Sequence, residues 1–262
     1  MIKKVLPILF LFVCAHGMSQ KLTTSLSNSI PLVANSFVGF DTMGDYYFIK
    51  DNVFTKKNAL QTWQYKNVAL GKITAVDIIN PLKIVVFYEN FNTCVLLDAQ
   101  LNEILQKNFS IALKETLVSN IGLASNNRLW LFNSLTNTIL LYDYTTNTNQ
   151  TVGQALTQKI VYAQTNFNTF YWIDELNNLY SCDVFGKVTL LCTVPAYDKI
   201  QILDNDRLLF SANNSLYLLN NISKSIFQIE IVENSFENFY CKDQNLAIFT
   251  NQEITNYKIK IP

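Results

Sequence analysis

The chain has 262 residues, of which 49% are hydrophobic, and it carries 20 basic and 20 acidic side chains. This composition is sufficient to bury a large core and excludes the disordered class. The only arginines are Arg128 and Arg207, and no basic cluster is available for phosphate contacts, so we expect no nucleic-acid partner.

The first segment has the features of a secretory signal peptide. Lys3 and Lys4 precede an apolar run over residues 5–13, and the small residue Ser19 stands at the end of the stretch. The apolar run is too short to span a bilayer. Residues 1–19 therefore predict a cleaved leader and an extracytoplasmic protein, located in the periplasm or at the outer membrane.

Two residues of this leader bear on function. Cys14 ends an "LFVC" stretch that resembles a lipobox, but Val13 is larger than the residue usual before a lipidated cysteine. We therefore favour soluble cleavage after Ser19, with a lipid anchor at Cys14 as the alternative. The only histidine is His16, so cleavage would leave no imidazole for a Ser-His-Asp, Cys-His or histidine-metal site.

The rest of the chain repeats itself. The segment "RLWLFNSLTNTILLYDYTTNT" (128–148) aligns with 83–103, 169–188, 207–225 and 245–262, and more distantly with 45–63. The first aligned apolar residues are spaced by about 40 residues, and they are Tyr46, Ile84, Leu129, Phe170, Leu208 and Leu246. Each copy is preceded by one further apolar run, and most are followed by another. Four short strands every 40 residues predict a β-propeller blade, whereas a β-sandwich has no reason to repeat at this period.

Residues 20–262 hold six such copies, which predicts one six-bladed β-propeller domain of four-stranded antiparallel blades. The last copy ends at Pro262 after three strands. A candidate strand lies within 20–36, before the first full copy. We expect this N-terminal strand to complete the last blade and close the ring, because closure removes exposed sheet edges.

The blade sequence resembles that of six-bladed propellers of the NHL, TolB-like and SMP-30/gluconolactonase-like group. Shared features in 129–148 are a small or polar break after the second strand, an Asn before the third, and Asp143 after its aromatic residue. Asp98 and Asp183 occupy the same place, while Asn220 departs from the pattern. The resemblance extends over the whole mature chain and implies a fold rather than an activity.

Enzymes of that group are usually hydrolases or lactonases with a divalent cation in the central channel. We expect the innermost strands to begin near five candidate binding residues, Asp77, Asn120, Gln164, Gln201 and Glu237. In an enzyme, Asp77 and Glu237 would coordinate a hard cation such as calcium, with a carbonyl oxygen from Asn120. No catalytic motif matches residue by residue, and an ordinary water-filled channel is the alternative.

Four cysteines follow the leader: Cys94, Cys182, Cys192 and Cys241. Their spacing matches neither a CxxC motif nor a zinc ribbon. A two-residue turn at Phe185-Gly186 would place Cys182 opposite Thr189, too far from Cys192 for a disulfide. We expect small buried residues that pack inside the blades, while an even number of cysteines in an oxidising compartment leaves disulfides open.

These observations favour an exported, non-catalytic β-propeller that binds or scaffolds another envelope protein or peptide. Two alternatives remain open: a divalent-metal-dependent hydrolase or lactonase with its site in the channel, and a structural subunit of an outer-membrane or secretion complex.

Overall fold

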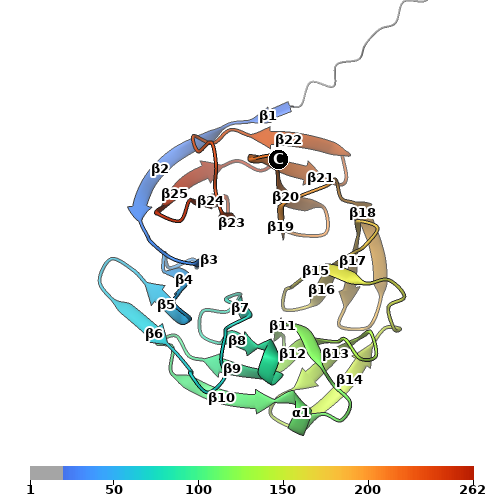
Figure 1. The fold of residues 1–262 in the computed structure, drawn as a ribbon. Helices are drawn as coiled ribbons and strands as arrows, with labels where there is room; N and C mark the ends of the chain where they lie inside the picture. The colour runs from blue at the N-terminus through green and yellow to red at the C-terminus, as the bar shows by residue number, and fades with distance from the viewer. Residues whose placement is uncertain (1–19) are drawn as a thin grey trace, which may run out of the picture.

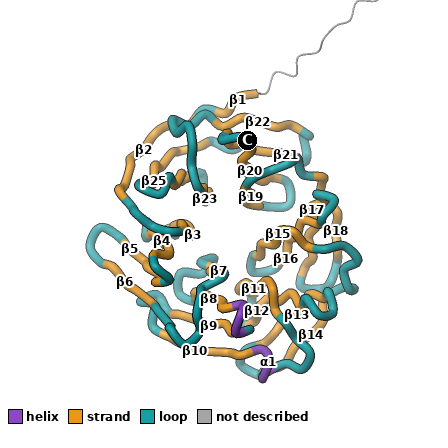
Figure 2. Tube along the Cα trace, viewed as in Figure 1, coloured by secondary structure: helices purple, strands orange, loops and turns teal. Residues whose placement is uncertain are grey.

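The computed structural model describes residues 20–262, which form a ring of six blades around a central channel (Figure 1). The predicted signal peptide, with Cys14 and His16, lies outside the described residues. Each blade is a four-stranded antiparallel sheet whose first strand lies nearest the channel, as Figure 2 shows for the strands in orange. The predicted fold is confirmed.

The first three blades follow one another along the chain. Blade 1 contains β3 (Ser36–Phe40), β4 (Tyr46–Lys50), β5 (Val53–Lys57) and β6 (Thr62–Tyr65). Blade 2 contains β7 (Ala75–Asp77), β8 (Ile84–Tyr88), β9 (Thr93–Leu97) and β10 (Glu103–Asn108). Blade 3 contains β11 (Val118–Ala124), β12 (Arg128–Asn133), β13 (Thr138–Asp143) and β14 (Thr148–Val152). Two short helical turns accompany blade 2, η1 (Glu89–Phe91) and α1 (Phe109–Ala112).

The remaining blades include the N-terminal strands. Blade 4 contains β15 (Ile160–Thr165), β16 (Thr169–Asp174), β17 (Asn178–Asp183) and β18 (Val188–Thr193). Blade 5 contains β19 (Lys199–Ile202), β20 (Arg207–Ala212), β21 (Ser215–Asn220) and β22 (Ser225–Ile229), with β1 (Gln20–Leu22) added at its edge. Blade 6 contains β23 (Asn238–Lys242), β24 (Asn245–Phe249), β25 (Glu253–Ile259) and β2 (Thr24–Pro31).

The ring closes through the N-terminal segment, as predicted. β2 pairs antiparallel with β25 and is the outermost strand of blade 6. β1 additionally pairs parallel with β22, so the segment joins blades 5 and 6. The Lys21 ammonium lies 3.1 Å from the Glu230 carboxylate beside this junction. The sequence did not indicate the β1 pairing.

The core lies between blades. β8 and β9 are buried along their whole length, because each face of the blade packs on a neighbour. Six apolar clusters fill the spaces between adjacent blades of the described chain. Asparagine and aspartate make most of the turns: they account for 12 of the 16 non-glycine residues with positive φ in this part of the chain.

One register prediction was wrong. Cys182 pairs with Val188 rather than Thr189, because the turn spans three residues between Asp183 and Lys187. A bulge between Leu179 and Tyr180 then restores the register. All four cysteines of the described chain are free; three are buried, as expected, and Cys192 is partly buried. No helix within residues 20–262 is long and apolar enough to cross a membrane.

Candidate functional site

One position of each innermost strand faces the neighbouring blade across the channel wall. In every blade it pairs with the residue directly after the first aligned apolar residue of the repeat, and we name the six residues the channel ring. Its members in chain order are Gly39, Asp77, Gly122, Gln164, Gln201 and Tyr240. Each channel-ring residue contacts the next blade at the residue that directly follows the channel-ring residue of that blade.

The polar members of the channel ring bond to the backbone of the next blade. Asp77 Oδ2 accepts the Leu123 N–H at 2.7 Å. Gln164 accepts the N–H of Ile202 at 2.9 Å and donates to its carbonyl at 2.6 Å. Gln201 does the same with Cys241, at 2.7 and 2.8 Å. These side chains therefore join blades 2 to 3, 4 to 5 and 5 to 6.

The other members make the same contact by packing. The Tyr240 ring meets the Phe40 ring edge-on, with centroids 5.2 Å apart. At Gly122 a side chain is excluded, because an added Cβ would lie 1.8 Å from Thr165 Oγ1. The channel wall is thus built from one repeated contact that four residue types make: glycine, aspartate, glutamine and tyrosine.

Four of the five predicted binding residues line the channel. Asp77, Asn120, Gln164 and Gln201 border a cavity of about 750 Å³, whereas Glu237 is exposed just before β23 and is not among its lining residues. Sequence reasoning located these strands but not the bonds that three of the side chains make. It also missed Tyr240, whose apolar ring gave no signal of a channel position.

Both carboxylate oxygens of Asp77 accept a hydrogen bond. Oδ1 accepts the N–H of Ile79 at 2.8 Å, in addition to the Leu123 bond. Burial raises the pKa of the Asp77 carboxyl, and the two N–H groups act in the opposite direction. Within residues 20–262, no group of three or more His, Cys, Asp or Glu side chains is placed to hold a metal ion.

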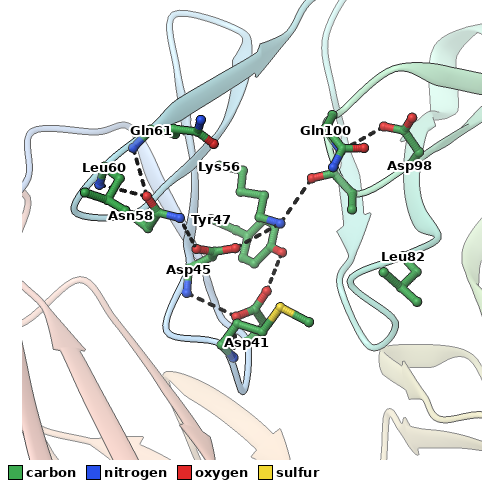
Figure 3. Close-up of polar contacts among 12 residues, drawn as sticks. Asp41, Asp45, Tyr47, Lys56, Asn58, Leu60, Gln61, Leu82, Asp98 and Gln100 are labelled. Carbon is green, nitrogen blue, oxygen red and sulfur yellow. Dashed lines mark hydrogen bonds and ion pairs between the residues drawn. The ribbon is translucent and has the colours of Figure 1, made fainter.

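A second polar cluster is buried in blade 1 (Figure 3). The Lys56 ammonium lies 2.9 Å from Asp45 Oδ2, with side-chain exposures of 5% and 7%. It also donates to the Ala99 carbonyl of blade 2 at 3.1 Å and lies over the rings of Tyr47 and Trp63. The ammonium therefore links two blades in an apolar environment.

The bonds continue into two loops. The Asn58 side-chain amide donates to Asp45 Oδ1 at 2.8 Å, and Asn58 Oδ1 accepts the N–H groups of Leu60 and Gln61. Asp41 accepts the Met43 and Asp45 N–H groups. We call Asp41, Asp45, Tyr47, Lys56 and Asn58 the blade 1 network.

Tyr47 completes this network. Its hydroxyl donates to Asp41 Oδ2 at 2.7 Å. Burial, followed by this hydrogen bond, raises the pKa of Tyr47 well above its usual value. The phenol therefore stays protonated and remains a donor to Asp41.

The blade 1 network departs from the repeat. The position of Lys56 is occupied in blades 2 to 6 by Leu96, Leu141, Ser181, Leu218 and Asn256. The position of Asp45 is occupied by Lys83, Arg128, Thr169, Arg207 and Asn245. A buried charge where three blades have leucine is a sequence signal that marks this site. It becomes interpretable once the strands are aligned by register.

No protein family matches the chain, and no curated protein matches it. Solved structures do. A catalytically inactive histidine-to-alanine variant of virginiamycin B lyase from Staphylococcus aureus, with quinupristin, is 11% identical, with 89% of this chain and 99% of that chain covered and a TM-score of 0.57. The chain is a β-propeller. BamB from Moraxella catarrhalis is 12% identical, with 91% and 98% covered and a TM-score of 0.51. YCF48 bound to D1 peptide is 8% identical, with 93% and 95% covered and a TM-score of 0.55. The three similar proteins share this fold and differ in what their names describe.

Proposed function

We propose that this chain is an exported, non-catalytic propeller that binds or scaffolds another protein in the bacterial cell envelope. The observation that carries the proposal is a set of apolar side chains held at ordered turns. Seven of them are between 60% and 92% exposed, and each N–H donates to an Asn or Asp side chain two residues earlier; they are Met43, Leu60, Leu82, Leu135, Leu176, Phe185 and Ile222.

Ordered apolar tips are suited to binding a partner. A loop whose turn is already formed loses little conformational entropy on association. Binding residues commonly sit on loops that a rigid scaffold positions. The channel offers less, because Asp77, Gln164 and Gln201 use their polar atoms to join blades.

The comparisons are consistent with this proposal. The YCF48 structure holds a peptide, so a similar propeller binds a protein segment. The lyase variant is catalytically inactive and has alanine in place of one histidine. The only histidine of the present chain is His16, in the predicted leader. Export rests on residues 1–19 and their signal-peptide pattern.

Export and partner binding are tested on the full chain. Expression in a Gram-negative host, followed by intact mass of the periplasmic protein, should show loss of residues 1–19. A lipid mass on Cys14, absent from a Cys14→Ala variant, would replace soluble export by anchoring. Affinity purification from cross-linked native membranes should then recover one protein in stoichiometric amount.

Three results would contradict the proposal. The first is a chain that stays in the cytosol with residues 1–19 intact, and the second is a chain that purifies without a stoichiometric partner. The third is a divalent ion that co-purifies with hydrolase activity and is lost in Asp77→Asn, since this would establish the channel enzyme.

A further inference from the structure

We propose that the outer edge of blade 4 is a docking site, and that its occupant is an extended segment of the partner protein that pairs with β18 as a fifth strand. The segment also inserts an apolar side chain into a pocket beside this strand. The inference rests on the proposed function and names the site and the form of the partner segment. We call residues 188–190 the blade 4 edge.

The blade 4 edge has backbone groups that point away from the sheet. β18 pairs only with β17 in the described chain, and Figure 1 shows it at the outer rim of the ring. The Asp183 N–H donates to the Lys187 carbonyl at 3.2 Å, and hydrogen-bonded and non-hydrogen-bonded pairs alternate along an antiparallel ladder. Counted from this pair, Val188 and Leu190 occupy non-hydrogen-bonded positions, so their N–H and C=O groups face outward.

The blade 4 edge is unprotected compared with the other outer strands. Exposed sheet edges are usually protected by charged residues, by proline or by a covering segment. β10 carries Glu103 and Lys107, β2 ends at Pro31, β22 is covered by β1, and the exposed residues of β6 and β14 are polar. β18 contains no charged residue, and Val188 and Leu190 are 44% and 57% exposed. An apolar edge of this kind is expected to be covered when the protein is in use.

The chain itself shows what covers such an edge. β1 adds to the outer strand of blade 5 by pairing parallel with β22 over three residues. The Glu230 N–H donates to the Leu22 carbonyl at 3.0 Å, and the Leu22 side chain packs against an apolar cluster of blades 5 and 6. The outer edge of a blade in this protein therefore accepts a short extended strand that contributes an apolar side chain.

The blade 4 edge matches such a strand in length. It begins after the turn bond at Lys187 and stops before Leu191, whose carbonyl accepts the Asn221 side-chain amide of blade 5 at 2.7 Å. Between these limits Val188 and Leu190 offer two N–H and two C=O groups. A segment about as long as β1 would satisfy them.

A pocket of about 420 Å³ adjoins the blade 4 edge. Val188 lines it together with Trp172, Tyr180 and the loop 153–158. The Trp172 and Tyr180 rings stack with centroids 5.2 Å apart, and Leu190 is the next cross-strand neighbour of Tyr180, so these side chains share one face of the blade. A strand added to β18 directs alternate side chains to this face, where the pocket can take an aromatic or large aliphatic one.

Charge does not select the occupant. Asp174, which also lines the pocket, is 1% exposed, and its carboxylate accepts N–H groups from its own turn. Asp183 and Lys187 lie together at the turn before β18, and Lys159 at the end of the pocket loop lies beside Glu175. Because each of these places carries both signs, the segment is selected by backbone pairing and by its apolar side chain.

The test uses the purified full chain and a phage-displayed library of random 12-residue peptides. Enriched peptides should contain an aromatic or large aliphatic residue within a stretch of β-forming residues. Amide hydrogen exchange followed by NMR should be fast at Val188 and Leu190 in the free chain and at least tenfold slower in the peptide complex. The Thr189 amide should be slow in both states, because its position in the ladder directs it to β17.

Lysine variants test the same edge in fluorescence polarisation. Val188→Lys and Leu190→Lys should each weaken peptide binding at least tenfold, because a lysine on an edge strand opposes pairing. Ile226→Lys is the matched control: Ile226 is 39% exposed and occupies the position of Val188 in blade 5, where β1 already covers the edge. It should bind like the unaltered chain, and circular dichroism should show native spectra for all three variants.

The remaining outcomes overturn the inference. Unchanged exchange at Val188 and Leu190 in the complex, or equal binding by every lysine variant, places the docking site elsewhere and leaves the proposed binding function intact. Failure to enrich any peptide removes the strand occupant, while capture from native membranes decides the proposed function separately. Concentration-dependent dimerisation that Leu190→Lys abolishes would make the occupant a second copy of the chain.

Discussion

Replacement of Lys56 by alanine leaves a buried carboxylate without its cation. The side chains of Lys56 and Asp45 are 5% and 7% exposed, and their charged atoms are 2.9 Å apart. Breaking a buried pair by removing one partner costs about 3–5 kcal/mol. For a chain of this size, each kcal/mol lowers Tm by roughly 2–4 °C, so Lys56→Ala should melt about 6–20 °C lower.

A double variant separates charge from packing. Lys56→Leu with Asp45→Asn removes both charges and keeps an oxygen that accepts from Asn58. Leucine occupies the same repeat position as Leu96 and Leu141 in blades 2 and 3. This variant should lie within about 1 kcal/mol of the unaltered chain, because an apolar replacement of a buried pair is neutral or stabilising.

The assay is urea unfolding followed by tryptophan fluorescence. Trp63, which lies under the Lys56 ammonium, reports directly on blade 1. The reasoning would be refuted by a cost below about 1 kcal/mol for Lys56→Ala, or by a double variant as unstable as the single one.

Three further predictions concern the channel and the closure of the ring. Gln201→Leu leaves the backbone N–H and carbonyl of Cys241 in blade 6 without their partner, so the free energy of unfolding in urea should fall by about 1–3 kcal/mol. Asn120→Leu, also in the channel, should change the free energy of unfolding by less than about 0.5 kcal/mol. Gly122→Ala places a Cβ against a blade 4 threonine and should cost about 1–3 kcal/mol; a native Tm would contradict the close approach. Deletion of 20–31 opens the edge of blade 6 and should lower Tm sharply, while deletion of 20–22 removes only β1 and should lower it less; equal melting of the two deletions would argue against closure by β2.

The fold was predictable because its signals are local. Apolar runs such as 129–132 and turns such as 133–137 recur with a period near 40, and each copy specifies its own sheet through neighbouring strands. Closure by a strand within 20–36 followed from counting, because the last copy has three strands and a sheet edge needs a partner. The pairing of β1 with β22 was not predictable, since three residues carry no periodicity and their partner lies some 200 positions away.

The candidate sites were predictable only in part. The sequence indicated that Asp77, Gln164 and Gln201 belong to the channel-facing strands. It did not show that their polar atoms are used by the next blade, because that depends on backbone groups about 40 residues away. Within "FTKKN", only the strand register distinguishes the buried Lys56 from the exposed Lys57.

By itself, the sequence determined the blade, the number of copies and the segment that completes the ring, because hydrophobic alternation and turn chemistry act between neighbours in the chain. The tertiary structure alone decided which polar side chains are committed to the scaffold and which apolar ones remain exposed. Those properties arise where one blade meets the next. The burial of Lys56, whose ammonium donates to Ala99 of blade 2, is set by that contact rather than by the residues beside it.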